Sequence, residues 1–167
     1  MALYFVANGP MPTTAAQVPV TTGTAIKTLL QVKPFNIAKI VEWGISFDGS
    51  AAATPIKVEL LETDVAATVT ASVDADVTKL GQGVGDQAVA SVAGLTLGTA
   101  ATGYTGSAEG TITAVRMLDV QLIAPTNQYV YQFPLGREPV IQIAKFGRIR
   151  VTAGAAVNAY CYMILDI

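Results

Sequence analysis

The sequence contains no histidine and only one cysteine, Cys161, among its 167 residues. The absence of histidine removes the commonest general base and the commonest metal ligand of proteins. A single cysteine cannot form a disulfide within the chain, and no imidazole is present to activate Cys161 as a nucleophile. We therefore expect a protein without enzymatic activity, without a cofactor and without a bound metal.

Charged residues are also scarce, because they make up 13% of the chain against about 25% in an average soluble domain. The net charge is −2, so the chain as a whole has no electrostatic attraction for nucleic acid. Hydrophobic residues make up 51% of the sequence. Two interpretations fit this composition: partners cover much of the surface, or the protein is a β domain with an uncharged, threonine-rich exterior.

Membrane and export signals are missing from the sequence. It has no run of about 18 apolar residues, so we expect no transmembrane helix and no membrane partner. The first ten residues, MALYFVANGP, lack the basic start and the long apolar core of a signal peptide. We expect the protein to be made and assembled in a cytoplasm.

Paired carboxylates remain as possible acid–base groups. Glu59 and Glu62 fall on opposite faces of a predicted strand, which separates them. Asp74 and Asp76 share a face in a threonine-rich stretch, where solvation is the simpler interpretation and a weak calcium site the alternative. The glycine-rich stretch GQGVG at 81–85 lacks the lysine and hydroxyl residue of a phosphate-binding loop, so we interpret it as flexible.

The sequence is rich in the alternating hydrophobic pattern that is typical of β-strands. The clearest case runs from Ile37 to Asp48, where one face is expected to hold Ile37, Val41, Trp43, Ile45 and Phe47. Trp43 and Phe47 are therefore predicted core residues. The other predicted strands are 26–32, 56–62, 95–97, 113–123, 129–133, 140–143, 148–151 and 158–165, with 65–77 either a strand or an extended arm. Roughly eight to ten strands without a convincing helix predict an all-β protein, an antiparallel β-sandwich of jelly-roll type.

The last predicted strand, Asn158 to Leu165, is apolar on both faces. Tyr160, Tyr162 and Ile164 point to one side, and the residues between them, including Cys161, point to the other. A strand without a polar face is expected in the middle of a sandwich or against another chain. Cys161 is then a small buried hydrophobe.

Two regions depart from the strand pattern. Residues 1–23 combine the apolar run Leu3 to Ala7 with three prolines, which predicts an N-terminal arm ahead of a β-sandwich domain over 24–167. The alternative is an ordinary first strand followed by a loop. Residues 80–111 are rich in glycine, alanine and threonine and predict long surface loops, with Tyr104 as their only aromatic residue.

Candidate interface residues come from the arm, the long loop, one turn and a small basic patch. The small basic patch consists of Lys145, Arg148 and Arg150. It lacks interleaved exposed aromatic residues, which favours salt bridges over nucleic-acid binding. The turn PLGREP offers an arginine suited to pairing with carboxylates. The candidates are Leu3, Tyr4, Phe5, Tyr104, Arg137, Glu138, Arg148 and Arg150.

Several short runs resemble those of small structural proteins of tailed bacteriophages. They are Gln132 to Pro139 (QFPLGREP), Gly147 to Ala153 (GRIRVTA) and Val157 to Tyr160 (VNAY), with Pro55 to Leu61 and Thr102 to Thr105 earlier in the chain. The resemblance spans about residues 40 to 165 and is to head-associated proteins of the decoration, or cement, type. It implies a β-rich protein made in a bacterial cytoplasm that coats the outside of a virion, binds the major capsid protein and forms homotrimers.

A different function class remains open beside capsid decoration. A tail-associated or fibre-associated module that recognises a receptor glycan would need exposed aromatic side chains with polar groups nearby. Tyr104, Tyr129 and Tyr131 are the candidates for such a site, although Tyr129 and Tyr131 alternate with their neighbours as core residues do. The number of copies in each purified particle separates the two functions, because decoration requires many copies and a tail component only a few.

Overall fold

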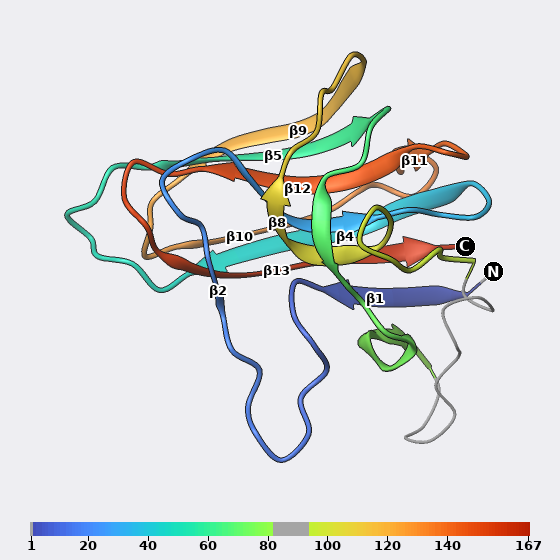
Figure 1. Cartoon of the computed structure of the whole chain (residues 1–167), viewed down its shortest axis with the longest axis horizontal. Helices are drawn as coiled ribbons and strands as arrows, with labels where there is room; N and C mark the ends of the chain where they lie inside the picture. The colour runs from blue at the N-terminus through green and yellow to red at the C-terminus, as the bar shows by residue number, and fades with distance from the viewer. Residues whose placement is uncertain (1, 82–93) are drawn as a thin grey trace.

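A computed structural model describes residues 2–81 and 94–167 and confirms an all-β sandwich (Figure 1). The described residues form thirteen strands and one turn of 3-10 helix. The elements are β1 (Leu3–Ala7), β2 (Val20–Thr21), β3 (Lys27–Val32), β4 (Ala38–Phe47), β5 (Ile56–Thr63), β6 (Thr68–Ala71), η1 (Asp74–Asp76), β7 (Val77–Lys79), β8 (Gly103–Ala108), β9 (Val115–Ile123), β10 (Gln128–Gln132), β11 (Val140–Ile141), β12 (Phe146–Thr152) and β13 (Asn158–Asp166).

Two antiparallel sheets make up the sandwich. Sheet A has the order β10-β4-β13-β1-β7, with β11 also paired to β4 and β2 paired to β13. Sheet B has the order β6-β8-β3-β12-β5-β9. Strands that are neighbours in each sheet are mostly distant in sequence, because the chain crosses repeatedly between the two layers.

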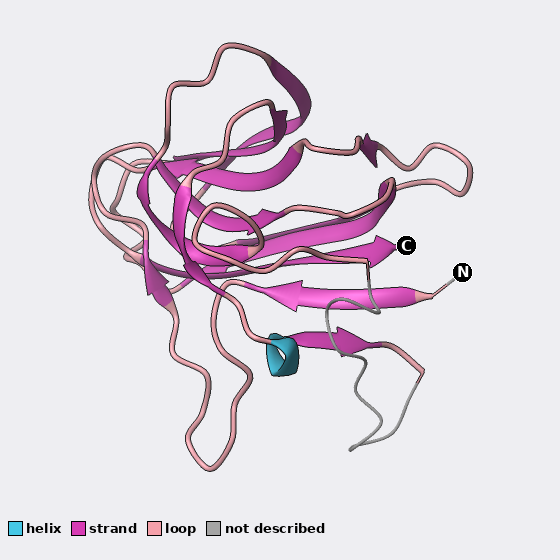
Figure 2. Cartoon of the chain, turned by 45° about the vertical axis from the view of Figure 1, so that its right-hand side comes forward, coloured by secondary structure: helices cyan, strands magenta, loops and turns pink. Residues whose placement is uncertain are grey.

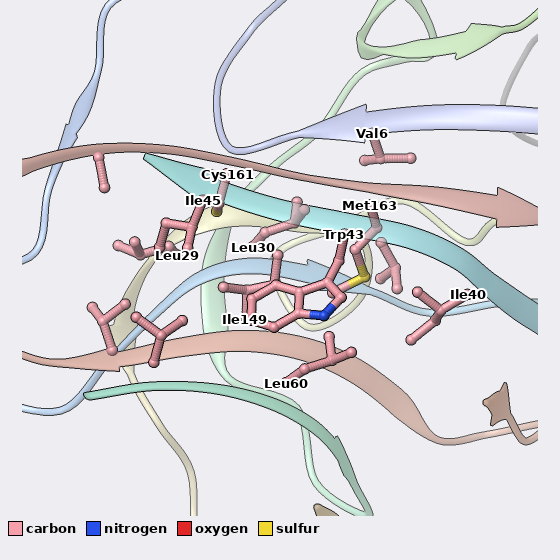
Figure 3. Close-up of a cluster of buried hydrophobic side chains, with 14 of the residues drawn as sticks. Val6, Leu29, Leu30, Ile40, Trp43, Ile45, Leu60, Ile149, Cys161 and Met163 are labelled. Atoms are coloured by element: carbon pink, nitrogen blue, oxygen red, sulfur yellow. The ribbon is translucent and has the colours of Figure 1, made fainter. Parts of the chain in front are cut away.

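The core lies between the sheets and is centred on Trp43 (Figure 3). Trp43 is fully buried among residues from both layers, including Leu60 and Ile149 of sheet B and Met163 of sheet A. Phe47 is also buried. The prediction that Trp43 and Phe47 are core residues is confirmed.

The predicted apolar face of β4 is wrong at its beginning. Ile164 of β13 pairs with Glu42 and Leu165 pairs with Ile40, so Val41 is an extra residue in a β-bulge. The bulge shifts the alternation, and Ile40 faces the core while Ile37 is exposed. A bulge leaves no signal in a pattern of alternating residues, which is why the sequence predicted one face from Ile37 to Phe47, interrupted only by Lys39.

β13 lies in the middle of sheet A, between β4 and β1, but only one of its two apolar faces is covered by the second sheet, which differs from the expected place inside a sandwich. Ala159, Cys161, Met163 and Leu165 face the core and are buried. Tyr160, Tyr162 and Ile164 face outward and are exposed or half-buried. One apolar face of this strand therefore forms part of the protein's exterior.

The expected arm over residues 1–23 is wrong for its first part. Leu3–Ala7 forms β1, which pairs with β13 along its whole length and with β7 on its other side. Tyr4 and Val6 of β1 are buried in the core. The prolines that suggested an arm lie only in the following segment, which projects as a loop between β1 and β2 (Figures 1 and 2).

The middle of the chain contains two strands that the sequence did not predict, the short β7 after Asp76 and β8, which includes Tyr104. Only Thr68–Ala71 of the predicted strand 65–77 is β6, and η1 follows it. Residues 95 and 97 form isolated bridges rather than a strand. The predicted flexibility of the GQGVG stretch falls mostly on residues 82–93, which lie outside the described residues.

Candidate functional site

The outer face of sheet A carries a continuous group of apolar side chains. Cross-strand pairing brings Phe5 beside Ile164 and places Gly44 between Val130 and Tyr162. Leu3 and Tyr160 are each 39% exposed and Val130 is 53% exposed. We call this group the outer aromatic patch: Leu3, Phe5, Val130, Tyr160, Tyr162 and Ile164.

Tyr162 is the centre of the outer aromatic patch. Its ring stacks on Phe5 with 5.3 Å between centroids, and its hydroxyl donates a hydrogen bond of 2.6 Å to Glu42. Gly44 makes room for the ring, because a Cβ at that position would lie 2.6 Å from a Tyr162 ring carbon. Burial and the bond to Glu42 raise the pKa of Tyr162, so its hydroxyl stays protonated. The patch is therefore an ordered surface.

The projecting loop, residues 8–19, borders the patch and is tied down at both ends. At its start, the buried Asn8 amide donates to the Ala159 carbonyl (3.0 Å) and accepts from the Cys161 amide (2.9 Å). Near its end, the Tyr160 hydroxyl donates to the Gln17 carbonyl. A hollow of about 190 Å³ lies between loop and sheet, lined in part by these residues.

The middle of the projecting loop is held by the carboxylate of Asp76. It accepts the backbone N–H of Met11 at 2.8 Å and that of Val73 at 2.8 Å. Asp76 is buried, so the prediction of a solvated carboxylate is wrong for this residue. Each oxygen of the Asp76 carboxylate accepts a backbone N–H, and the described residues contain no cluster of side chains able to hold a metal ion.

The structure places the three candidates of β1 in different environments. Leu3 and Phe5 face outward in the outer aromatic patch, as an interface role requires. Tyr4 is only 4% exposed and packs in the core. Its assignment as an interface residue is wrong, because alternate residues of a strand point to opposite faces.

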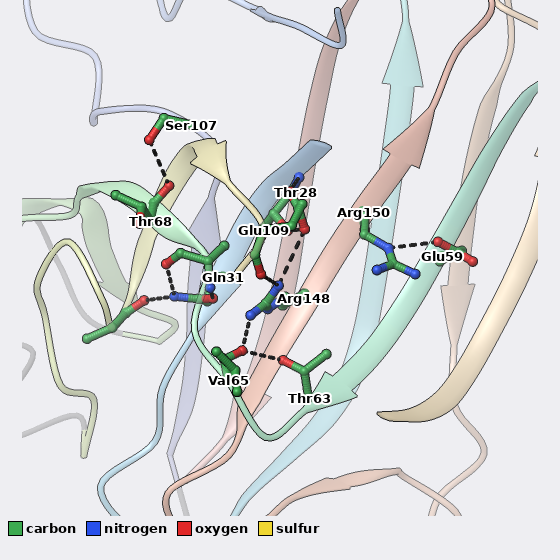
Figure 4. A network of polar contacts seen from close by, with 12 residues as sticks. Thr28, Gln31, Glu59, Thr63, Val65, Thr68, Ser107, Glu109, Arg148 and Arg150 are labelled. Atoms are coloured by element: carbon green, nitrogen blue, oxygen red, sulfur yellow. Dashed lines mark hydrogen bonds and ion pairs between the residues drawn. The ribbon is translucent and has the colours of Figure 1, made fainter. Parts of the chain in front are cut away.

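Arg148 is a second correction, because its side chain is completely buried (Figure 4). Its guanidinium donates to the Val65 carbonyl and pairs with Glu109 at 3.4 Å. Glu109 also accepts the backbone N–H and hydroxyl of Thr28. Burial lowers the pKa of Arg148, and the Glu109 charge opposes that shift. Arg148 therefore fastens two loops to sheet B inside the chain and is not an interface residue.

Arg150 also has an intramolecular role, because it pairs with the buried Glu59 at 2.9 Å. Glu62 pairs separately with Arg116 at 2.7 Å and accepts the backbone N–H of Gln142. The expectation that the two glutamates are separated agrees with these different partners. Salt bridges of the kind expected in the basic patch are present at Arg148 and Arg150.

The remaining candidates lie in a turn and in β8. Arg137 is exposed and donates its backbone N–H to the Pro134 carbonyl, closing a turn in which Gly136 has a φ of 81°. The Glu138 carboxylate accepts backbone N–H groups of Glu138 and Gly136, which lowers its pKa. Tyr104 is half-buried and pairs with Leu30 and Thr70. Arg137 and Glu138 share one turn, whereas Tyr104 lies in β8 of sheet B, so the three residues do not form a single site.

Sequence reasoning missed an exposed apolar row on β9. Val115, Met117, Val120 and Leu122 face away from the core and are 59%, 56%, 43% and 74% exposed. We call these four residues the β9 row. The alternation of the sequence was sufficient to predict a strand here, but a row of apolar residues does not reveal which side is buried.

The described residues include no helix that is long and apolar enough to cross a membrane. Most of the polar groups reported above are engaged in ion pairs and hydrogen bonds that stabilise the fold, whereas the described residues leave the two apolar surfaces at least partly exposed. The best candidate functional sites are therefore surfaces for association. Searches of family models, curated proteins and solved structures find no match to this chain.

Proposed function

We propose that this chain is a non-enzymatic structural protein of a tailed-phage virion that coats the outside of the capsid and binds the major capsid protein. The proposal rests on the motif resemblance and on one structural observation, the outer aromatic patch. Contiguous exposed apolar surface on a folded domain is typical of protein–protein contact sites. Aromatic residues are also the type most enriched in such contacts.

The projecting loop extends the proposed attachment surface beyond the sheet. Its exposed residues 12–16 are small or hydroxyl-bearing, and its stem is fixed to β13 and to Asp76. A fixed stem lowers the conformational entropy lost when the loop docks. Loop and patch together form a surface suited to lie on a protein shell.

Assembly multiplies the strength of such contacts. The resemblance implies a homotrimer, and we propose an oligomer of this kind on the capsid. A contact that is weak for one subunit becomes strong when linked subunits bind a regular lattice together. No cofactor is needed for this function.

Copy number and location in purified virions test the proposal. We expect quantitative mass spectrometry to find hundreds of copies per particle and electron cryomicroscopy to place them on the head exterior. A few copies at the tail would contradict decoration and support the receptor-binding alternative. Absence from the particle would contradict both.

Binding to undecorated heads tests the surface itself. Tyr160→Ser and Val130→Asp change exposed residues of the outer aromatic patch and are expected to reduce occupancy strongly. Leu135→Asp is the matched control, because Leu135 is 97% exposed in a turn outside the patch. The loop is tested by replacing residues 11–18 with a short glycine–serine linker, since deletion of 1–20 would also remove β1 from sheet A. Unchanged occupancy in the patch variants would contradict the assigned surface.

A further inference from the structure

β9 forms the free edge of sheet B. It is nine residues long, pairs with β5 on one side and has no partner among the described residues on the other. Its edge therefore presents unpaired backbone groups next to the exposed β9 row. An edge of this kind is a template for pairing with another chain.

The charged residues of β9 do not lie on its exposed apolar face. Arg116 turns toward Glu62 and the Val140 carbonyl, and Asp119 accepts a hydrogen bond from Tyr129 of β10. Both side chains are thus directed to the side of β9 that faces sheet A. The strand also contains no lysine and no proline, the residues that commonly block edge pairing.

A bulge gives the side-chain directions of β9 an unusual symmetry. Met117 pairs with Leu61 and Asp119 pairs with Leu60, so Leu118 is an extra residue. Residues 115 to 122 consequently point out, in, out, in, in, out, in and out. This order is the same when read in either direction, with its midpoint between Leu118 and Asp119.

We propose that β9 pairs antiparallel with β9 of a second copy of this chain, about a two-fold axis between Leu118 and Asp119. In a two-fold antiparallel contact, residues that lie directly opposite each other must point to the same side of the sheet. The palindromic order meets this condition at every position. The outward pairs are Val115 with Leu122 and Met117 with Val120. A shift of two residues along the partner places an inward residue opposite an outward one at the centre.

The charge pattern of β9 also favours a second copy of the chain as its partner. Arg116 lies opposite Gln121 in this register, and Leu118 lies opposite Asp119, so no like charges are directly paired. The contact joins the β9 rows of two copies into one apolar surface and continues sheet B across the axis. It does not depend on the proposed function, and it can join two single subunits or two trimers.

Engineered cysteines test the register. Cys161 is the chain's only cysteine and is buried, so added thiols can be detected without background. Directly opposite Cα atoms in an antiparallel pair lie about 4.5–5.5 Å apart, which is within the range of Cα separations in disulfides. We expect the double variant Met117→Cys/Val120→Cys to become a covalent dimer on oxidation. Met117→Cys alone should remain a single chain, because its own symmetry mate lies three residues away, about 10 Å along the strand.

The molecular mass in solution, measured by light scattering, tests the contact without cross-linking. We expect the wild type to contain an even number of copies and Val120→Lys/Leu122→Lys to halve its mass. The control is Val18→Lys/Leu135→Lys, which changes two exposed apolar residues elsewhere and should leave the mass unchanged. Circular dichroism verifies that each variant is folded.

Three results would overturn the inference. The first is a wild type that stays a single copy or an isolated trimer at all concentrations. The second is cross-linking of the Met117→Cys variant on its own. The third is that β9 amides are protected from hydrogen exchange only when the protein is bound to the capsid. The third result would indicate that β9 contacts the capsid protein and not a second copy of this chain. A trimer without the two-fold contact would leave the proposed function intact, and a dimer absent from virions would refute only the proposed function.

Discussion

Trp43 shows how one side chain can link the two sheets. Its ring is fully buried and lies 5.3 Å from the ring of Tyr129, whose neighbours Tyr131 and Phe133 continue the aromatic row. Its indole nitrogen has no hydrogen-bond partner among the described residues, so its contribution comes from packing. It is also the only tryptophan of the chain, which makes fluorescence a direct report on the core.

We expect Trp43→Ala to lower the free energy of unfolding by about 3–5 kcal/mol, through lost burial and the cavity left behind. Trp43→Phe should cost less, because it keeps an aromatic ring and loses no hydrogen bond. Urea unfolding followed by circular dichroism measures both. Near-native stability of the alanine variant would contradict the position of Trp43 at the centre of the core.

Asp64 provides a residue-scale prediction about pH. A hydrogen bond from the Thr113 hydroxyl and another from the Ala114 amide at 3.0 Å lower its pKa from 3.8 to about 2. Between these values the unfolded chain binds more protons than the folded one, so the stabilisation is present above pH 3.8 and is lost as pH falls toward 2. Asp64→Asn should therefore weaken the dependence of stability on pH in this window.

Titration of Asp64 by nuclear magnetic resonance checks the physical cause. The pKa should lie near 2 in the wild type and should rise in Thr113→Ala, which removes the largest contribution. A wild-type pKa at or above 3.8 would contradict the hydrogen-bonded arrangement. A free energy of unfolding that depends on pH equally in the wild type and in Asp64→Asn would also contradict this arrangement.

At the scale of elements, alternation in the sequence was sufficient to predict most strands, including β4, β5, β9, β10 and β13. It was not sufficient to place bulges, because an extra residue changes the face without changing composition. Val41 and Leu118 are both such residues, and each alters which side chains point outward. The faces of strands with two apolar sides were therefore decided only by tertiary structure.

The candidate site was less predictable than the strands. The arginines at 148 and 150 looked alike in sequence, but one is buried against Glu109 and the other pairs with Glu59. The arm was inferred from proline content, yet the prolines follow β1 and do not interrupt it. Glu62 accepts the backbone N–H of Gln142, which lies eighty residues away in sequence. A pair so distant along the chain leaves no pattern that could be recognised locally in the sequence.

Gly44 allows a test of how β4 and β13 fit together. A methyl group at this position would meet the Tyr162 ring, so Gly44→Ala should lower the free energy of unfolding by about 1–3 kcal/mol. In a Tyr162→Ala background the same change should cost much less, because the obstructing ring is gone. A double-mutant cycle by urea unfolding measures this coupling, and additive effects would contradict the close packing.

At the scale of the whole molecule, central and edge strands should differ in stability. β13 and β12 each pair with strands on both sides, whereas β10, at the edge of sheet A, pairs only with β4 among the described residues. Amide hydrogen exchange should therefore be slowest in β13 and β12 and faster in β10. Exchange in β13 as fast as in β10 would contradict the arrangement of sheet A.

The projecting loop also makes the protein a natural scaffold for peptide display. Both of its stems are anchored on one strand, since Ala7 pairs with Tyr162 and Val20 with Ala159. A guest epitope grafted into residues 12–16 would be presented away from both sheets without changing their register. The entropic cost of lengthening a closed loop grows only with the logarithm of its length, so even a long graft should leave the scaffold folded.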